Sequence, residues 1–378
     1  MIIQAFLRWV ETARTGERIR AASALGRAYV DAQLNGLDRR AAEMAMTFLL
    51  DDPSPKVRLA LAEVLCSCSS VPRAIILGLA GDQPEIAYLV VSHSPVLTDD
   101  DLVDLAARGT LETRALIAAR SFVSRGVAAA IAEIGDEDEM LILLENPGAL
   151  LSRRSLKRIA ERLGHSASVR DLLLARNDLP SAARHALVEE VGAALAAFGL
   201  VQVTIGEGRV QRVTREACDI AAVGMVGTTA VEELPDLVTH LRETGRLTPA
   251  FLLHALVTGR AEFFSAAIVD LSGVSEKRVR SILSGGRVHS IRALFESAGL
   301  GRDVSETFAT AVLLWRQDGS GSIDGHATVS AELLARLRRG RATSPTDAAM
   351  IDLLERLAFA EERQSARDYA ELAARQAA

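Results

Sequence analysis

The chain has 378 residues, of which 49% are hydrophobic and only 4% aromatic, and its formal net charge is −6. This hydrophobic content excludes a wholly disordered chain, and the shortage of aromatic residues argues against a β-sandwich. The negative charge argues against sequence-independent binding of nucleic acid, which needs a basic surface to displace phosphate counterions. We therefore expect an all-α protein.

Residues 1–50 are predicted to form N-terminal helices, and residues 51–197 a set of HEAT-like helical repeats. The clearest helix begins after Ser54, a good capping residue, with Pro55 at its first position. Its apolar positions recur at helical spacing on more than one face, so neighbours must cover two sides of it. The evenly spaced Val57, Ile86 and Ala115 mark successive copies. The sequence therefore predicts a HEAT-like α-solenoid followed by a second helical block.

Glycines and prolines divide the rest of the chain. Residues 198–231 are predicted to be a linker with one helix, over about 210–222. Residues 232–317 are predicted to be a second helical domain of five short helices, each ending at a glycine. Residues 318–378 are predicted to be a polar loop and C-terminal helices, the last of which opens with Ser344-Pro345.

The segment 245–300 carries a family resemblance. Arg246-Leu247-Thr248-Pro249, Phe263-Phe264, Gly273-Val274 and Ala298-Gly299-Leu300 are among its most specific residues. With the repeats before it, over roughly 40–315, the chain resembles the bacterial domain-of-unknown-function family 2336. The resemblance implies an α-helical, HEAT-like protein of unassigned function, and the family offers no catalytic residues to carry over.

One helix in the repeats is rich in positive charge. Its cationic residues fall on adjacent faces and only Glu161 offsets them within the helix; they are Arg153, Arg154, Lys157, Arg158 and Arg162. They are our candidate site for an acidic partner. The alternative is a solvated helix face paired with nearby acids at 136–139. A second group, Arg336, Arg338, Arg339 and Arg341, is predicted to be an exposed helix end.

Other candidate chemistry is weak. Asp318, Ser320, Ser322 and Asp324 resemble the middle of a calcium-binding EF-hand loop, but Arg316 and Ala327 occupy the positions of two principal ligands. We expect a Gly/Ser turn there. Cys66 and Cys68 point in different directions on one helix, so they cannot chelate one ion. We predict no catalytic residue, no metal and no cofactor.

The cysteine content and the hydropathy of the chain indicate the cellular compartment of the protein. Three cysteines, Cys66, Cys68 and Cys218, are too few for a disulfide framework and fit a reducing compartment. Arg8 and Glu11 interrupt the first apolar run, so we expect no signal peptide. No stretch approaches the roughly 20 uncharged residues of a transmembrane helix. We therefore expect a cytoplasmic protein without a membrane partner.

Three functions are consistent with these observations. A non-catalytic scaffold or adaptor would bind a protein partner through the surface of the helical repeats. A nucleic-acid or nucleotide-binding regulator would use the Arg-rich helix faces, although nucleic acid fits the net charge poorly. A HEAT-type enzyme would need convergent acids and an aromatic platform. We expect the first, not an enzyme, and leave the partner and the oligomeric state open.

Overall fold

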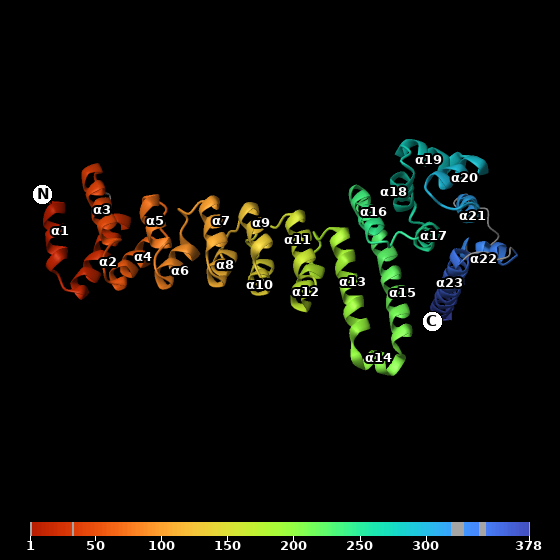
Figure 1. Cartoon of the computed structure of the whole chain (residues 1–378), viewed down its shortest axis with the longest axis horizontal. Helices are drawn as coiled ribbons and strands as arrows, with labels where there is room; N and C mark the ends of the chain where they lie inside the picture. The colour runs from red at the N-terminus through yellow and green to blue at the C-terminus, as the bar shows by residue number, and fades with distance from the viewer. Residues whose placement is uncertain (1, 32–33, 319–328, 340–344, 378) are drawn as a thin grey trace. The chain divides into compact units, whose positions relative to one another are not determined.

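The computed structural model describes residues 2–31, 34–318, 329–339 and 345–377. As expected, these residues are all-α: they form 23 α-helices and one short 3-10 helix, with no strand (Figure 1). The chain divides into two compact units, residues 1–179 (unit 1) and 180–378 (unit 2). The boundary differs from the expected one, which placed the end of the repeats at residue 197.

Unit 1 contains twelve helices among its described residues. They are α1 (Ile2–Thr12), α2 (Thr15–Asp31), α3 (Gly36–Leu49), α4 (Pro55–Leu65), α5 (Arg73–Ala80), α6 (Pro84–His93), α7 (Asp99–Arg108), α8 (Leu111–Ala118), α9 (Arg125–Ile134), α10 (Glu137–Glu145), α11 (Arg153–Leu163) and α12 (Ala167–Ala175).

The helices of unit 1 pack in successive layers. The even-numbered helices from α2 to α12 each contact the next even-numbered helix, and α7, α9 and α11 contact one another in the same way (Figure 1). Val57 and Ile86 are buried in α4 and α6, and Ala115 lies half-buried in α8, so the evenly spaced residues occupy successive helices of one row. Because α4 has neighbours on both sides, its buried residues lie on more than one face, and Leu59 and Val64 are half-buried.

Ion pairs join successive layers of unit 1. Arg58 of α4 forms a bidentate pair with Asp82, at 2.6 and 2.8 Å, in the turn that precedes α6. This guanidinium holds the pKa of Asp82 below its ordinary value. Arg18 of α2 pairs with the buried Asp52 at 2.8 Å, and Arg114 of α8 pairs with Glu139 of α10 at 2.7 Å. Buried charges are thus neutralised across the layers.

Unit 2 contains eleven α-helices and the 3-10 helix among its described residues. They are α13 (Ser181–Ala197), α14 (Gly199–Ile205), α15 (Glu207–Val226), η1 (Val231–Glu233), α16 (Leu234–Glu243), α17 (Pro249–Val257), α18 (Ala261–Ser272), α19 (Glu276–Gly285), α20 (Val288–Ser297), α21 (Arg302–Asp318), α22 (Val329–Arg339) and α23 (Pro345–Ala377).

The expected linker at 198–231 is instead part of unit 2. Its 20-residue helix α15 packs along α13 and buries Cys218, Ala222 and Val223. The two helices approach closely at Gly192, where a Cβ atom would lie 2.6 Å from the Cys218 sulfur. A glycine in α13 therefore permits the contact that makes α15 structural.

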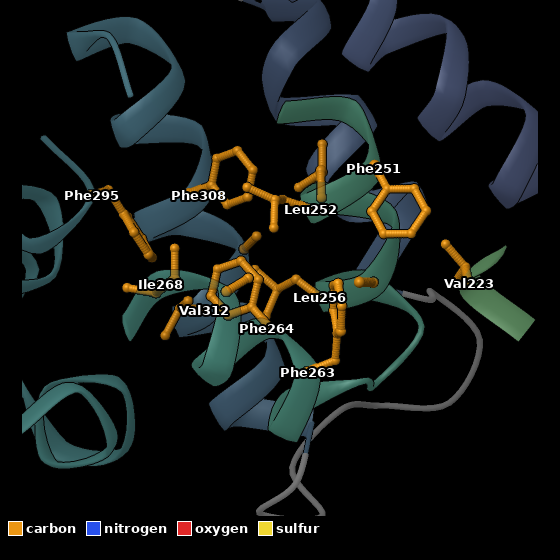
Figure 2. Close-up of a cluster of buried hydrophobic side chains, with 14 of the residues drawn as sticks. Val223, Phe251, Leu252, Leu256, Phe263, Phe264, Ile268, Phe295, Phe308 and Val312 are labelled. Atoms are coloured by element: carbon orange, nitrogen blue, oxygen red, sulfur yellow. The ribbon is translucent and has the colours of Figure 1, made fainter. Parts of the chain in front are cut away.

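Phenylalanines form the centre of the unit 2 core. Phe264 of α18 stacks on Phe308 of α21 with ring centroids 5.9 Å apart, and Phe295 of α20 meets Phe308 edge-on at 5.6 Å (Figure 2). Phe251 and Phe263 make a further edge contact at 5.9 Å, near Val223 of α15. Such ring pairs stabilise the core beyond the burial of their apolar area, and they favour particular ring orientations.

The turns of unit 2 use glycine as expected. Left-handed backbone (φ from +66° to +84°) follows helices α16, α17, α18 and α20, at Gly245, Gly259, Gly273 and Gly299. This conformation closes a helix end at little steric cost only for glycine. Six helices, α16 to α21, occupy the region where five were expected, because α21 follows Gly299.

Two C-terminal predictions fall partly on residues that are not described. Residues 319–328, which hold most of the EF-hand-like pattern, lie outside the described residues, and so does Arg341. Of the second basic group, Arg336 pairs with Glu332 at 2.6 Å and Arg338 with Glu355 at 2.7 Å. Both ion pairs are exposed, so each is worth little to stability.

Candidate functional site

The basic helix predicted from sequence is α11. It begins after Ser152, whose hydroxyl accepts a hydrogen bond of 3.0 Å from the Ser155 amide and so satisfies one unpaired donor of the first turn. Leu156, Ile159 and Ala160 are buried against the neighbouring helices. With its apolar face fixed in this way, α11 directs its cationic residues toward the surface.

An open cleft of about 500 Å³ lies between α9 and α11. Its floor includes Ala129 and Ala132 of α9, whose small side chains leave the space. The polar residues that line it are Glu133, Ser152, Arg154, Ser155, Lys157, Arg158 and Glu161. Three of the five predicted cations therefore share one cleft.

Arg158 forms the wall of the cleft that faces α9. Its guanidinium makes a bidentate pair with Glu133, at 2.8 and 2.7 Å, and lies 3.7 Å from Glu161. The hydrogen bonds from Arg158 hold the pKa of Glu133 below its usual range, and the charges of Arg162 and Arg154 act in the same direction. The Glu133 carboxylate in turn raises the pKa of Arg158. The pair positions Arg158 and joins α11 to α9.

The other four cations have different surroundings. Arg154 and Lys157 are exposed and line the cleft, with the Lys157 amine 3.9 Å from Glu161. Arg153 is exposed; the hydrogen bonds from Arg176 lower the pKa of Asp178, and the charge of Arg153 acts in the same direction. Arg162 donates to the Ala132 carbonyl at 2.8 Å, where α9 approaches its C-terminal end. The structure therefore brings Arg154, Lys157 and Arg158 together, and uses Arg162 as a helix cap.

The alternative interpretation, a solvated helix face paired with nearby acids, fits the ion pairs of Arg158 with Glu133 and of Lys157 with Glu161, although two of the acids at 136–139 have other partners. Glu137 accepts a 2.6 Å hydrogen bond from Ser166, and Glu139 is buried in its pair with Arg114. Arg158 of α11 pairs with Glu133, an acid that sequence reasoning missed. A signal was present: Glu133 and Arg158 are 25 residues apart, like the Arg114–Glu139 pair between neighbouring layers.

The first turn of α11 is positively charged, although the N-terminal end of a helix favours negative charge. Its first turn contains Arg153 and Arg154 and no acid, whereas α7 and α10 each begin with three acids. The N-terminal end of a helix bears a partial positive charge, so cations there reduce helix stability. Together the helix end and the cleft side chains make a positive surface suited to a carboxylate or a phosphate.

A family model matches most of the chain. A family model described as "uncharacterised protein conserved in bacteria", the domain-of-unknown-function family 2336, covers residues 86–347. The chain belongs to this family. No curated protein and no solved structure matches the chain significantly.

The family 2336 match includes the basic cleft and the aromatic core of unit 2. It begins later than the resemblance noted from sequence, at residue 86 in α6, and extends further, to residue 347 in the first turn of α23. It assigns no role to any residue.

Unit 2 contains a second polar cluster, which includes two histidines. His185 of α13 is 2% exposed, and its Nδ1 lies 3.3 Å from Nε2 of His240 in α16. Its Nε2 lies 3.8 Å from Glu189, which also pairs with Arg246. Burial, helped by the charges of His240 and Arg246, lowers the pKa of His185 to about 4. The cluster joins α13 to α16 with a neutral imidazole.

Within the described ranges, no group of three or more His, Cys, Asp or Glu side chains is arranged to hold a metal ion. Likewise, none of the described helices combines the length and apolarity required to cross a bilayer. The three cysteines are free thiols, and burial raises the pKa of the Cys218 thiol, so Cys218 is a poor nucleophile at neutral pH.

Proposed function

We propose that the protein is a non-catalytic scaffold of HEAT-like repeats that binds an acidic segment of a protein partner in the cleft between α9 and α11. The observation that carries the proposal is the grouping of Arg154, Lys157 and Arg158 in one open cleft at the positive end of α11. We place the protein in the cytoplasm, because its cysteines are free thiols.

The chemistry of the cleft favours carboxylates. Arg154 and Lys157 are three positions apart on α11, so their charges lie on one face, and the Ser152 and Ser155 hydroxyls beside them are 2.8 Å apart. Arg158 is held by Glu133 and presents a fixed edge to the cleft. Side-chain carboxylates of an extended acidic segment would reach the two exposed cations in turn.

The same cleft is poorly suited to nucleic acid. Among the described residues that line it, none is aromatic, so bases would find no stacking platform. Glu133 and Glu161 lie beside the cations and would repel a continuous phosphate backbone. The net charge of −6 also opposes the long-range attraction on which nucleic-acid binding depends.

Charge reversal in the cleft tests the proposal. The double variant Arg154→Glu, Lys157→Glu changes two exposed residues and leaves the Arg158–Glu133 pair in place. A matched control, Arg40→Glu with Lys56→Glu, makes the same charge change at exposed positions on α3 and α4. Each tagged protein is recovered from the native bacterium, and co-purified proteins are measured by mass spectrometry.

We expect one or more acidic partners to be lost with the cleft variant and kept with the control. A fluorescent ten-residue polyglutamate peptide gives a direct measurement: the cleft variant should bind it at least tenfold more weakly, and salt should weaken wild-type binding. Equal recovery and equal peptide affinity for both variants would refute the site. Tighter binding of duplex DNA than of the peptide would favour the nucleic-acid function.

A further inference from the structure

The helical hairpin of α13 and α15 ends in an exposed apolar tip, residues 195–206. The short helix α14 closes the hairpin and packs on the ends of α13 and α15 (Figure 1). Four large apolar side chains of the tip are exposed by 58, 59, 72 and 88%, and they are Leu195, Phe198, Leu200 and Val203. Single exposed apolar side chains are ordinary on a protein surface, but a contiguous group marks an interaction site.

The tip is uncharged and is followed directly by positive charge. Residues 195–206 include no Asp, Glu, Lys or Arg. Arg209, Arg212 and Arg215 then follow on the first turns of α15, and all three are exposed. The one acid among residues 195–215 is Glu207. The charge beside the tip is therefore positive, opposite in sign to the net charge of −6 for the whole chain.

Acids of the same chain do not neutralise the arginines nearest the tip. Among the described residues, neither Arg209 nor Arg212 has an ion-pair partner. Other exposed arginines of unit 2 do have such partners. For example, Arg242 pairs with Asp270 at 3.3 Å, and Arg280 pairs with Glu276 at 3.0 Å. Arg209 and Arg212 are therefore available to bind an anion outside the chain.

An open cleft of about 500 Å³ lies between α13 and α15 and reaches the tip at Ala196. Arg212 and Arg215 line this cleft. The acid in its wall, Glu189, already pairs with Arg246, so it does not cancel the charge of the other two arginines. The apolar tip thus adjoins a polar cleft with excess positive charge.

We infer that the tip binds the surface of a bilayer that contains anionic phospholipids. The apolar side chains of the tip enter the boundary between headgroups and acyl chains, and the arginines of α15 meet the lipid phosphates. A second copy of the chain fits the tip less well, because an isologous contact there would bring these arginines toward their own copies. The expectation of no membrane partner was based on the absence of a spanning stretch, which does not bear on binding at the surface.

Co-flotation of the full-length protein with lipid vesicles tests the inference. We expect binding to phosphatidylcholine vesicles that contain about 30% phosphatidylglycerol, an anionic lipid. Binding to vesicles of phosphatidylcholine alone should be about tenfold weaker, because the arginines then lack the negative surface potential. High salt should weaken the binding to the anionic vesicles, since it screens the same attraction.

Substitutions in the tip test the apolar contribution. Phe198→Ser with Leu200→Ser changes two exposed side chains and should weaken binding to the anionic vesicles by about tenfold or more. The matched control, Phe359→Ser with Val288→Ser, makes similar changes at exposed positions on α23 and α20 and should bind as wild type. Circular dichroism verifies that each variant is folded.

Charge reversal tests the arginines. Arg209→Glu with Arg212→Glu should weaken binding to the anionic vesicles by about tenfold or more, because two attractions become repulsions. The control Arg278→Glu with Arg287→Glu makes the same charge change at other exposed positions of unit 2 and should have a smaller effect.

Absence of binding to the anionic vesicles, or equal losses in the tip variants and their controls, would overturn the inference. Analytical ultracentrifugation without lipid provides a further check. A dimer that Phe198→Ser with Leu200→Ser dissociates would also overturn the inference, because a second copy of the chain would then cover the tip.

Discussion

The buried imidazole of His185 makes the stability of unit 2 sensitive to acid. Its pKa is about 4 in the folded protein, against an ordinary value of 6.5. Below pH 6.5 the unfolded chain therefore takes up a proton that the folded chain refuses until about pH 4. Stability consequently rises with pH across this window and falls as the solution is acidified. The perturbation that isolates the effect is His185→Gln, which keeps a hydrogen-bonding side chain but cannot titrate.

The size of the effect follows from the two pKa values. Between pH 7 and pH 5, His185 should lower the free energy of unfolding by about 2 kcal/mol, and by about 3 kcal/mol when pH 4 is reached. His254 of α17 is also buried, with a pKa of about 4, so it should add a similar loss. His185→Gln should therefore remove about half of the pH dependence due to these two histidines.

Urea unfolding of the full chain between pH 4.5 and 7.5 measures this dependence. The protein has two tryptophans, and in a Trp9→Phe background the fluorescence of Trp315 reports unit 2 alone. His289→Gln is the control, since His289 is exposed on α20. We expect the slope of unfolding free energy against pH to fall in His185→Gln and to stay unchanged in His289→Gln. Equal slopes in wild type and His185→Gln would refute the reasoning.

Three further substitutions test the fold by thermal and urea unfolding. Phe264→Ala removes a ring that touches Phe295 and Phe308 and should lower the free energy of unfolding by about 3–5 kcal/mol. The control Phe359→Ala, at an exposed position, should change this free energy by less than about 0.5 kcal/mol. Similar losses for the two variants would contradict the packing. Arg316→Met removes three hydrogen bonds to the carbonyls of Ile282, Leu283 and Gly286, at the end of α19, and should lower the free energy of unfolding by about 1–3 kcal/mol. The control Arg302→Met, at an exposed position, should not have this effect. Arg58→Met leaves Asp82 without its partner and should destabilise unit 1 by about 1–3 kcal/mol; a neutral result would mean that the pairs between layers do not stabilise it.

Local signals in the sequence predicted most helices. Pro55 begins α4 as expected, because proline suits the first turn of a helix, although the Ser54 side chain makes no capping hydrogen bond. Gly273 ends α18 because its left-handed backbone excludes most side chains. The buried face of α23 includes Met350, Leu354 and Ala358, as helical periodicity indicates.

Contacts between distant residues were not predictable in the same way. The segment 198–231 contains an alternating run and several glycines, which favoured a linker, but α15 is stabilised by its contact with α13 at Gly192. The contact depends on α13 packing against α15 in the fold, and the sequence of residues 198–231 alone does not show this. The basic residues of α11 were predicted from their spacing, whereas the cleft was not, because it exists only where Ala129 and Ala132 of the neighbouring helix leave room.

The layered contacts of unit 1 have a consequence for how it opens. Each inner layer is covered on both sides, whereas α1, at the beginning of the row, packs on α3. Backbone amides of α1 should therefore exchange with solvent deuterium fastest, and protection should build up over the following layers toward α6 and α8. Local unfolding of α1 would leave the layers around α9 and α11 folded, because each layer of unit 1 packs mainly on its immediate neighbours.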